Sequence, residues 1–190
     1  MTPKIAICVG HSRLVNGRAE GGAVSVGNVS EWTYNRDLAN LITASLDDLG
    51  IDCVIVAEYA GQGYGAAQRW LAGALRTIGA TAAIELHFNS AEDPAANGHE
   101  WLHWHSSAGG KRLAESLDRN MTADVPGLRA RGLKPKSPGD RGAEFLRGTH
   151  CPAVIVETGF GSSPHDWKIL VQQKPAIAHS IAVGIADFLR

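Results

Sequence analysis

Residues 4–11, KIAICVGH, decide the fold class of this chain of 190 residues. Their apolar run is rich in branched side chains and is closed by Gly10, which is typical of a buried β-strand. Three further runs of this kind lie at residues 52–56, 81–88 and 151–157. Strands that are apolar on both faces are typical of parallel sheets that helices cover on both sides.

Helical patterns separate these strands. Ser30 is a good N-cap, and the apolar residues after it repeat at helical spacing until Gly50, which predicts a helix over residues 31–49. Further helices are predicted at residues 66–78, 110–120, 164–170 and 175–189. The alternation of strands and helices predicts an α/β fold in a single domain, with a twisted, mostly parallel sheet and helices on both faces.

Two segments depart from this alternation. HEWLHW at residues 99–104 alternates apolar and polar side chains, as a half-buried strand does. Residues 123–148 hold many prolines, glycines and basic residues without a sustained period, which predicts a long surface excursion. The positive charge of this segment suits either contact with an anionic substrate or simple solvation. The basic residues that carry it are Arg131, Lys134, Lys136, Arg141 and Arg147.

The charge balance argues against polyanionic partners. The 18 basic and 19 acidic residues give a formal net charge of -1, which provides no excess positive field for nucleic acid or an anionic membrane. The first apolar run is too short for a signal-peptide core or a membrane span. We therefore expect a monomer that has no nucleic-acid or membrane partner and is cytoplasmic in the cell that produces it.

Two histidines and two glutamates stand where a parallel sheet places a site. His11 follows the first strand and His87 closes the third, so both imidazoles are expected at the carboxyl edge of the sheet, where α/β proteins bind ligands. Glu31 begins the first helix, on its inward stripe. Two imidazoles and one carboxylate match the open zinc site of hydrolases, in which water takes the fourth position. Glu157 ends the strand AVIVE at the same edge and can serve as the base.

An ordered set of motifs adds a family resemblance. The set is GHS at 10–12, SEW at 30–32, ELHFN at 85–89, GHE at 98–100, RGLK at 131–134 and VETGF at 156–160. In this order the motifs resemble the zinc-dependent N-acetylmuramoyl-L-alanine amidases of the third amidase family, which include catalytic domains of phage endolysins.

The resemblance implies a reaction and a set of roles. It makes His11, Glu31 and His87 the ligands of one Zn²⁺ per chain and Glu157 the catalytic glutamate. The implied reaction is hydrolysis of the amide between the lactyl group of N-acetylmuramic acid and L-alanine in peptidoglycan. It also implies one catalytic domain over residues 1–190 without a separate wall-binding domain, acting on the cell wall after release, as a phage or prophage lysin does.

Some positions depart from the commoner family pattern, namely Val9, Ser12 and Glu85. Glu85 lies two residues before His87 on a strand and hence on the same face. It is a candidate for orienting that imidazole, for sensing the charge of the metal, or for an ion pair with an arginine. Asn89 and Arg131 are candidates for contacts with the substrate or with the residues around the metal.

Four other interpretations stay open. His99, His103 and His105 suggest a second metal site, although no carboxylate or cysteine partner is evident. The loop AGQGYGA at 60–66 suggests a nucleotide site but lacks the GxGxxG spacing and the Gly-Lys-Ser/Thr of a phosphate loop. The same zinc and base also suit a peptidase that cuts within the stem peptide. A peptidoglycan-binding or phage structural module without activity is the alternative from outside the enzymes.

Overall fold

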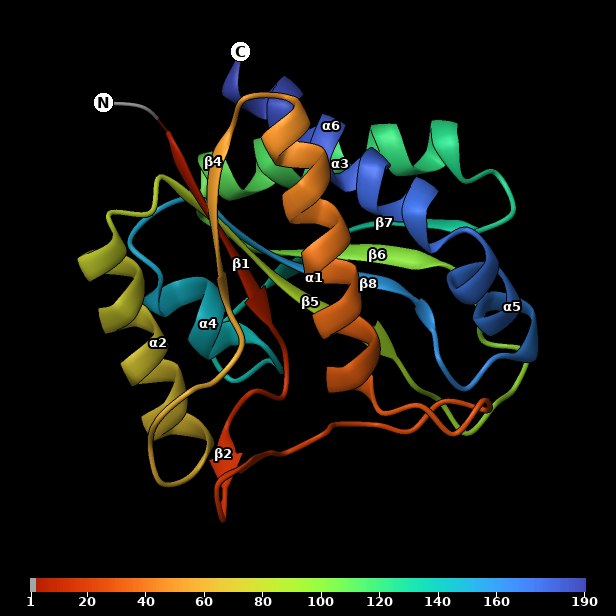
Figure 1. The fold of residues 1–190 in the computed structure, drawn as a ribbon, viewed down its shortest axis with the longest axis horizontal. Helices are drawn as coiled ribbons and strands as arrows, with labels where there is room; N and C mark the ends of the chain where they lie inside the picture. The colour runs from red at the N-terminus through yellow and green to blue at the C-terminus, as the bar shows by residue number, and fades with distance from the viewer. Residues whose placement is uncertain (1–2) are drawn as a thin grey trace.

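A six-stranded sheet runs through the centre of the molecule in the order β4-β1-β5-β8-β6-β7 (Figure 1). The computed structural model describes residues 3–190. The strands of this sheet are β1 (Lys4–Val9), β4 (Asp52–Val56), β5 (Ala82–Asn89), β6 (His99–Trp104), β7 (Ala130–Lys136) and β8 (Ala153–Phe160). The first four strands in this order are parallel, whereas β6 is antiparallel to β8 and parallel to β7, so the predicted mostly parallel sheet is confirmed. A separate short hairpin joins β2 (Leu14–Val15) to β3 (Arg18–Ala19).

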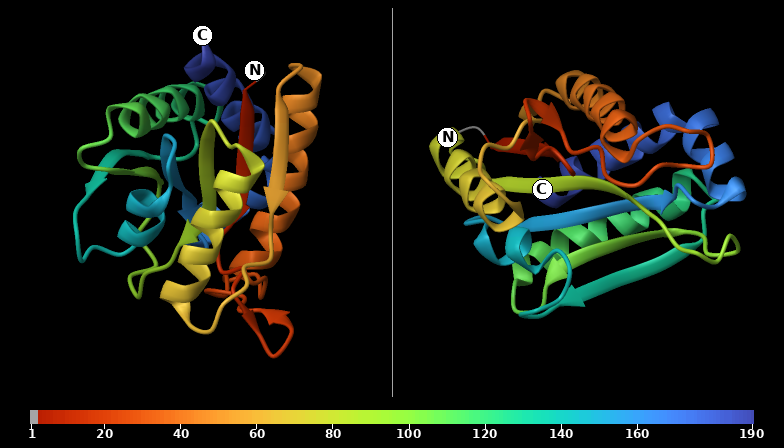
Figure 2. Two further views of the ribbon diagram at one scale, coloured as in Figure 1. Left: turned by 90° about the vertical axis from the view of Figure 1, so that its left-hand side faces the viewer. Right: turned by 90° about the horizontal axis from the view of Figure 1, so that it is seen from below.

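Helices cover both faces of the sheet, as predicted. They are α1 (Glu31–Asp48), α2 (Tyr64–Ile78), α3 (Ala108–Asp124), α4 (Ala143–Gly148), α5 (Pro164–Gln172) and α6 (Lys174–Leu189). The helices α1, α3, α5 and α6 pack on one face and α2 and α4 on the other, and the end-on views show these two layers (Figure 2). No helix within residues 3–190 is long and apolar enough to cross a membrane.

Alternation along β1 explains why its sequence is apolar throughout. Ile5 and Ile7 pack with Leu38 of α1 in the larger hydrophobic cluster, while Ala6 and Cys8 pack with the α2 side in the second cluster. Because successive side chains of a strand point to opposite faces, each cluster takes every second residue. A continuous apolar run therefore indicates a central strand with both faces covered.

The start of α1 brings an acidic residue to the carboxyl edge of the sheet. Ser30 caps the helix, because its hydroxyl oxygen accepts a hydrogen bond from the Thr33 amide at 3.2 Å. The helix ends at Asp48, and Gly50 follows with a φ of 71°. The predicted helix is confirmed to within one residue, and its first residue is Glu31.

The predicted surface excursion over residues 123–148 is wrong. The helix α3 continues to Asp124, the edge strand β7 follows, and α4 comes next. Among residues 3–190, β7 pairs with β6 alone and is an edge strand. An edge strand tolerates Pro135, because proline lacks the backbone N–H that would bond to a second neighbouring strand. Its residues are mostly half-buried, which explains why no alternation marks this strand in the sequence. Strand β8 is also longer than predicted and continues three residues beyond Glu157.

Candidate metal centre and its cavity

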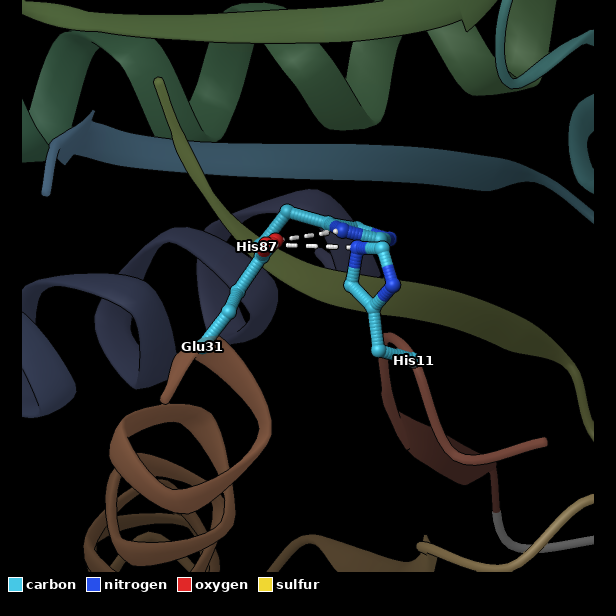
Figure 3. Close-up of side chains that lie close together, drawn as sticks. All are labelled: His11, Glu31 and His87. Carbon is cyan, nitrogen blue, oxygen red and sulfur yellow. Dashed lines mark hydrogen bonds and ion pairs between the residues drawn. The ribbon is translucent and has the colours of Figure 1, made fainter. Parts of the chain in front are cut away.

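Three side chains meet where β1, β5 and α1 converge. His11 directly follows Gly10 at the end of β1, His87 lies near the end of β5, and Glu31 opens α1. Glu31 Oε1 lies 2.9 Å from His87 Nδ1, and Glu31 Oε2 lies 3.2 Å from His11 Nε2. Figure 3 shows the three side chains pointing toward one another from these separate elements. One ligand atom from each residue lies within 4.8 Å of the others, which confirms the predicted meeting of the three.

Backbone contacts fix the Glu31 carboxylate between the two imidazoles. Its Oε1 accepts a hydrogen bond from the Phe88 amide at 3.2 Å, and its Oε2 accepts one from the Ala23 amide at 3.1 Å. Gly22 has a φ of 70°, and a Cβ there would meet the His11 ring and Glu31 Oε2. The loop before α1 therefore passes over the centre at a distance that only glycine allows.

The charges of these groups depend on one another. Burial by itself raises the pKa of Glu31, but the adjacent nitrogens of His11 and His87 and their positive charge outweigh burial and hold that pKa well below its usual range. Burial lowers the pKa of His87, but hydrogen bonds to Glu31 and Glu85 raise it well above its ordinary value. A positive charge is therefore favoured between these carboxylates, as a proton or as a metal ion.

The donor set fits a divalent transition metal. His11 Nε2 is shielded from solvent and lacks a partner in hydrogen-bonding geometry within residues 3–190, although Glu31 Oε2 lies close by. A nitrogen with a free lone pair beside a second imidazole and a carboxylate is the arrangement that open zinc sites use. His11, Glu31 and His87 can hold such an ion.

Glu157 lies beside this centre on the neighbouring strand. Its Cα is paired in register with that of His87, and both residues line the same cavity. Glu157 Oε2 is shielded from solvent and has no hydrogen-bond partner within residues 3–190. Burial, followed by the negative charges of Glu31 and Glu100, raises the pKa of Glu157 to about 7, against the opposing charges of His87 and Arg141. A carboxyl group with such a pKa can both accept and return a proton near neutral pH.

A cavity of about 370 Å³ opens over the two histidines and Glu157. It lies on the α2 and α4 side of the sheet, and one wall is formed by Lys136, the last residue of β7, and by the segment between β7 and α4, which includes Arg141. This size is within the range of small-molecule and peptide sites. The sequence indicated a functional role for the 123–148 region, but it did not indicate that Tyr59, Gln68 and Glu100 also line the cavity.

The comparison with protein families agrees with this geometry. Residues 5–187 match the family Amidase_3, described as N-acetylmuramoyl-L-alanine amidase. The chain belongs to this amidase family. The match spans nearly the whole chain and includes all four residues of the predicted site.

Several known proteins resemble the chain. The N-acetylmuramoyl-L-alanine amidase CwlM of Mycobacterium tuberculosis is 28% identical over 166 residues, which are 84% of this chain but 39% of that protein. The chain thus spans about two-fifths of the length of this curated relative. The catalytic domain of the CD27L endolysin targeting Clostridia difficile is 25% identical with a TM-score of 0.80, and 97% of each chain is covered. AmiC2, an N-acetylmuramoyl-L-alanine amidase of Nostoc punctiforme, is 23% identical with a TM-score of 0.81, over 98% of this chain and 97% of that one.

Other residues singled out in the sequence form a second polar cluster beside the cavity. Asn89 donates a hydrogen bond to Glu100 Oε1 at 2.9 Å, and Arg131 Nε donates to Glu100 Oε2 at 2.8 Å. The Arg131 guanidinium also lies over the Phe160 ring, 5.1 Å from its centroid. Asn89 and Glu100 line the cavity. Arg131 holds Glu100 from behind and is not part of the lining.

The second histidine cluster does not bring three candidate ligand atoms together within residues 3–190. Within residues 3–190, His11, Glu31 and His87 are the group whose atoms could hold an ion together. The prediction that His99 has no carboxylate neighbour is wrong, because its Nδ1 lies 3.6 Å from Asp118 Oδ1. That nitrogen also accepts a hydrogen bond from the Trp101 indole, so the buried ring is part of the core packing under α3.

Gly10 leaves room for the His87 imidazole, which gives a testable prediction. A Cβ at Gly10 would overlap the His87 ring and lie 2.6 Å from Nδ1. We expect Gly10→Ala to displace this imidazole and to lower hydrolysis about 10²-fold, the usual size of a misplacement of about 1 Å at a reacting centre. The matched control is Gly73→Ala on α2, where an added Cβ meets no atom within 4 Å. Equal rates for both variants in a wall-digestion assay would contradict the prediction.

Proposed function

We propose that this chain hydrolyses the amide between the lactyl group of N-acetylmuramic acid and L-alanine in peptidoglycan. In this proposal His11, Glu31 and His87 hold one zinc ion and Glu157 moves the proton. The observation that carries the proposal is that His11, Glu31 and His87 lie close enough to share an ion and that His11, His87 and Glu157 line one cavity. Membership of the amidase family supports the choice of bond.

The reaction needs a proton to move from water to the leaving nitrogen. Zinc in such a site supplies a Lewis acid and lowers the pKa of water to about 7. Glu157 accepts a proton from the attacking water and then delivers it to the departing amine of L-alanine, because an amide nitrogen leaves poorly unless it is protonated. The pKa of Glu157 near 7 suits both halves of this transfer. The unpartnered Oε2 is the atom that is free to carry the proton.

The cavity wall also suits an anionic substrate. Lys136 at the end of β7 and Arg141 before α4 line the cavity, and their side chains form no ion pair within 4.0 Å among residues 3–190. Stem peptides of peptidoglycan carry carboxylates, so these cations can hold the peptide while its amide lies over the centre. Basic residues of the 123–148 segment thus contact the substrate in this proposal.

Digestion of purified sacculi tests the function. The amidase proposal predicts new amino termini of L-alanine and no new reducing sugar ends. New amino termini of other residues would instead identify a zinc peptidase. Binding to sacculi without release of peptide would identify a module without activity. The Glu157→Gln protein serves as the control for contaminating hydrolases.

The biological setting that we propose is wall lysis of the kind phage and prophage lysins perform. The likeness to the CD27L endolysin catalytic domain supports this setting. In it the chain acts as a monomer with one zinc ion. Turbidity loss of bacteria after addition of the purified protein from outside tests this proposal, and intact cells with digested isolated sacculi would contradict it.

The raised pKa of His87 predicts that zinc binding releases a proton. Because contacts with Glu31 and Glu85 raise this pKa and favour the protonated imidazole, His87 must lose a proton to ligate zinc. Zinc affinity should therefore rise with pH until the pH exceeds the pKa of His87. Titration calorimetry in buffers of different ionisation heat measures the released protons. A binding heat that does not depend on the buffer would show that the prediction is wrong.

A further inference from the structure

Glu85 contacts the side of His87 that faces away from Glu31. The two residues lie on the same face of β5, and Glu85 Oε2 is 3.3 Å from His87 Nε2. The other ring nitrogen, Nδ1, is the one that faces Glu31 at 2.9 Å. Each nitrogen of this imidazole therefore has its own carboxylate.

The Glu85 carboxylate is itself held from two other elements. Its Oε1 accepts a hydrogen bond from the Tyr59 hydroxyl at 3.1 Å and another from Gln68 Nε2 at 3.4 Å. Tyr59 follows β4, and Gln68 lies on α2 next to the buried stripe of that helix. Only 2% of Glu85 is exposed, so its rotamer is fixed by these contacts and by the surrounding core.

A buried carboxylate is costly unless it has a partner of opposite charge or several hydrogen bonds. Within residues 3–190, no lysine or arginine nitrogen pairs with Glu85, and His87 is its ion-pair partner. The arginine ion pair considered from the sequence is therefore wrong. Glu85 is thus a second buried carboxylate beside His87, and this position indicates that Glu85 acts on the His87 imidazole.

We infer that Glu85 is a positioning residue that keeps a proton on His87 Nε2 and leaves Nδ1 for the metal. This inference rests on the proposed function, in which His87 is a zinc ligand. A neutral imidazole carries its proton on one nitrogen, and a carboxylate at that nitrogen decides which one and also makes the other more basic. Tyr59 and Gln68 add to the effect, because they stop the carboxylate from turning away.

Zinc affinity of Glu85→Gln tests the inference. This variant keeps the size of the side chain and removes its charge, and we expect the zinc dissociation constant to rise about 10–100-fold, as for other partners of metal-bound histidines. Tyr59→Phe removes one hydrogen bond to Glu85 and is expected to weaken zinc in the same direction by a smaller factor. The matched control is Glu144→Gln, which removes a carboxylate from the cavity wall without contacting His87. Its zinc affinity should equal that of the wild type.

A spectroscopic readout separates positioning from a merely structural role. In the zinc-loaded wild type, nitrogen-15 NMR of labelled histidine should place the proton of His87 on Nε2. A proton on Nδ1, or unchanged zinc affinity in Glu85→Gln beside a wild type that binds zinc, would overturn the inference and leave the proposed function intact. A wild type that binds no zinc at these residues would overturn the proposed function itself.

Discussion

We expect Glu157→Gln to lower hydrolysis of the peptidoglycan amide by about 10²–10⁴-fold, which is the usual contribution of general acid–base catalysis. The variant keeps the size of the side chain and leaves His11, Glu31 and His87 in place, so zinc binding and folding should match the wild type. The physical reason is that the solvent-shielded Oε2, which has no hydrogen-bond partner within residues 3–190, is the atom that we propose accepts and returns the proton. Release of L-alanine amino termini from sacculi measures the effect.

Glu100→Gln provides the matched control for this loss. Glu100 is the register partner of Glu157 on β6 and lines the same cavity, but its oxygens already accept hydrogen bonds from Asn89 and Arg131. Removing its charge should therefore cost much less activity than removing that of Glu157. Wild-type turnover in Glu157→Gln would show that Glu157 does not transfer the proton.

Glu31→Gln is expected to have the second large effect, on zinc itself. Its carboxylate lies between both imidazoles and is also hydrogen-bonded to the Phe88 and Ala23 amides. Glutamine keeps the size of the side chain but loses its charge. Loss of a hydrogen-bond partner of a ligand typically lowers metal affinity about 10–100-fold, and loss of Glu31 itself should lower zinc affinity by more than this. Competition with a chromophoric chelator measures the affinity, and activity should disappear with the metal.

Glu20→Gln tests whether the effect belongs to the centre or to nearby charge in general. Glu20 Oε1 lies 3.7 Å from His11 Nδ1, but its carboxylate is more than a third exposed and is paired with Arg13. Solvent screens such a pair, so this variant should bind zinc nearly as well as the wild type. Equal losses in the two variants would contradict ligation by Glu31.

The sequence predicted the central sheet and the meeting of His11, Glu31 and His87 because both depend on strong local signals. A continuous apolar run such as residues 4–9 indicates a strand covered on both faces. An N-cap such as Ser30 marks where a helix begins. Parallel topology then places the ends of such strands at one edge, which is why His11, Glu31 and His87 were predicted together. These three are close enough in the structure to share an ion.

The cavity wall was not predicted, for physical reasons that particular residues show. Pro135 and the surrounding glycines suggest a loop, whereas an edge strand tolerates them because it has a single neighbour. The contact between Glu85 and Tyr59 joins residues 26 positions apart, and no local pattern encodes such a pair. The position of Gln68 could have indicated a buried polar contact, because a polar residue beside the apolar stripe of a helix needs a hydrogen-bond partner.

A crystal structure of the zinc-loaded protein, with anomalous diffraction measured on both sides of the zinc absorption edge, tests the central claim most directly. We predict one anomalous peak per chain that is bonded to a nitrogen of His11, a nitrogen of His87 and a carboxylate oxygen of Glu31, with Glu157 beside it and not bonded. A peak elsewhere, or no peak at these residues in a protein that still releases L-alanine termini, would contradict it.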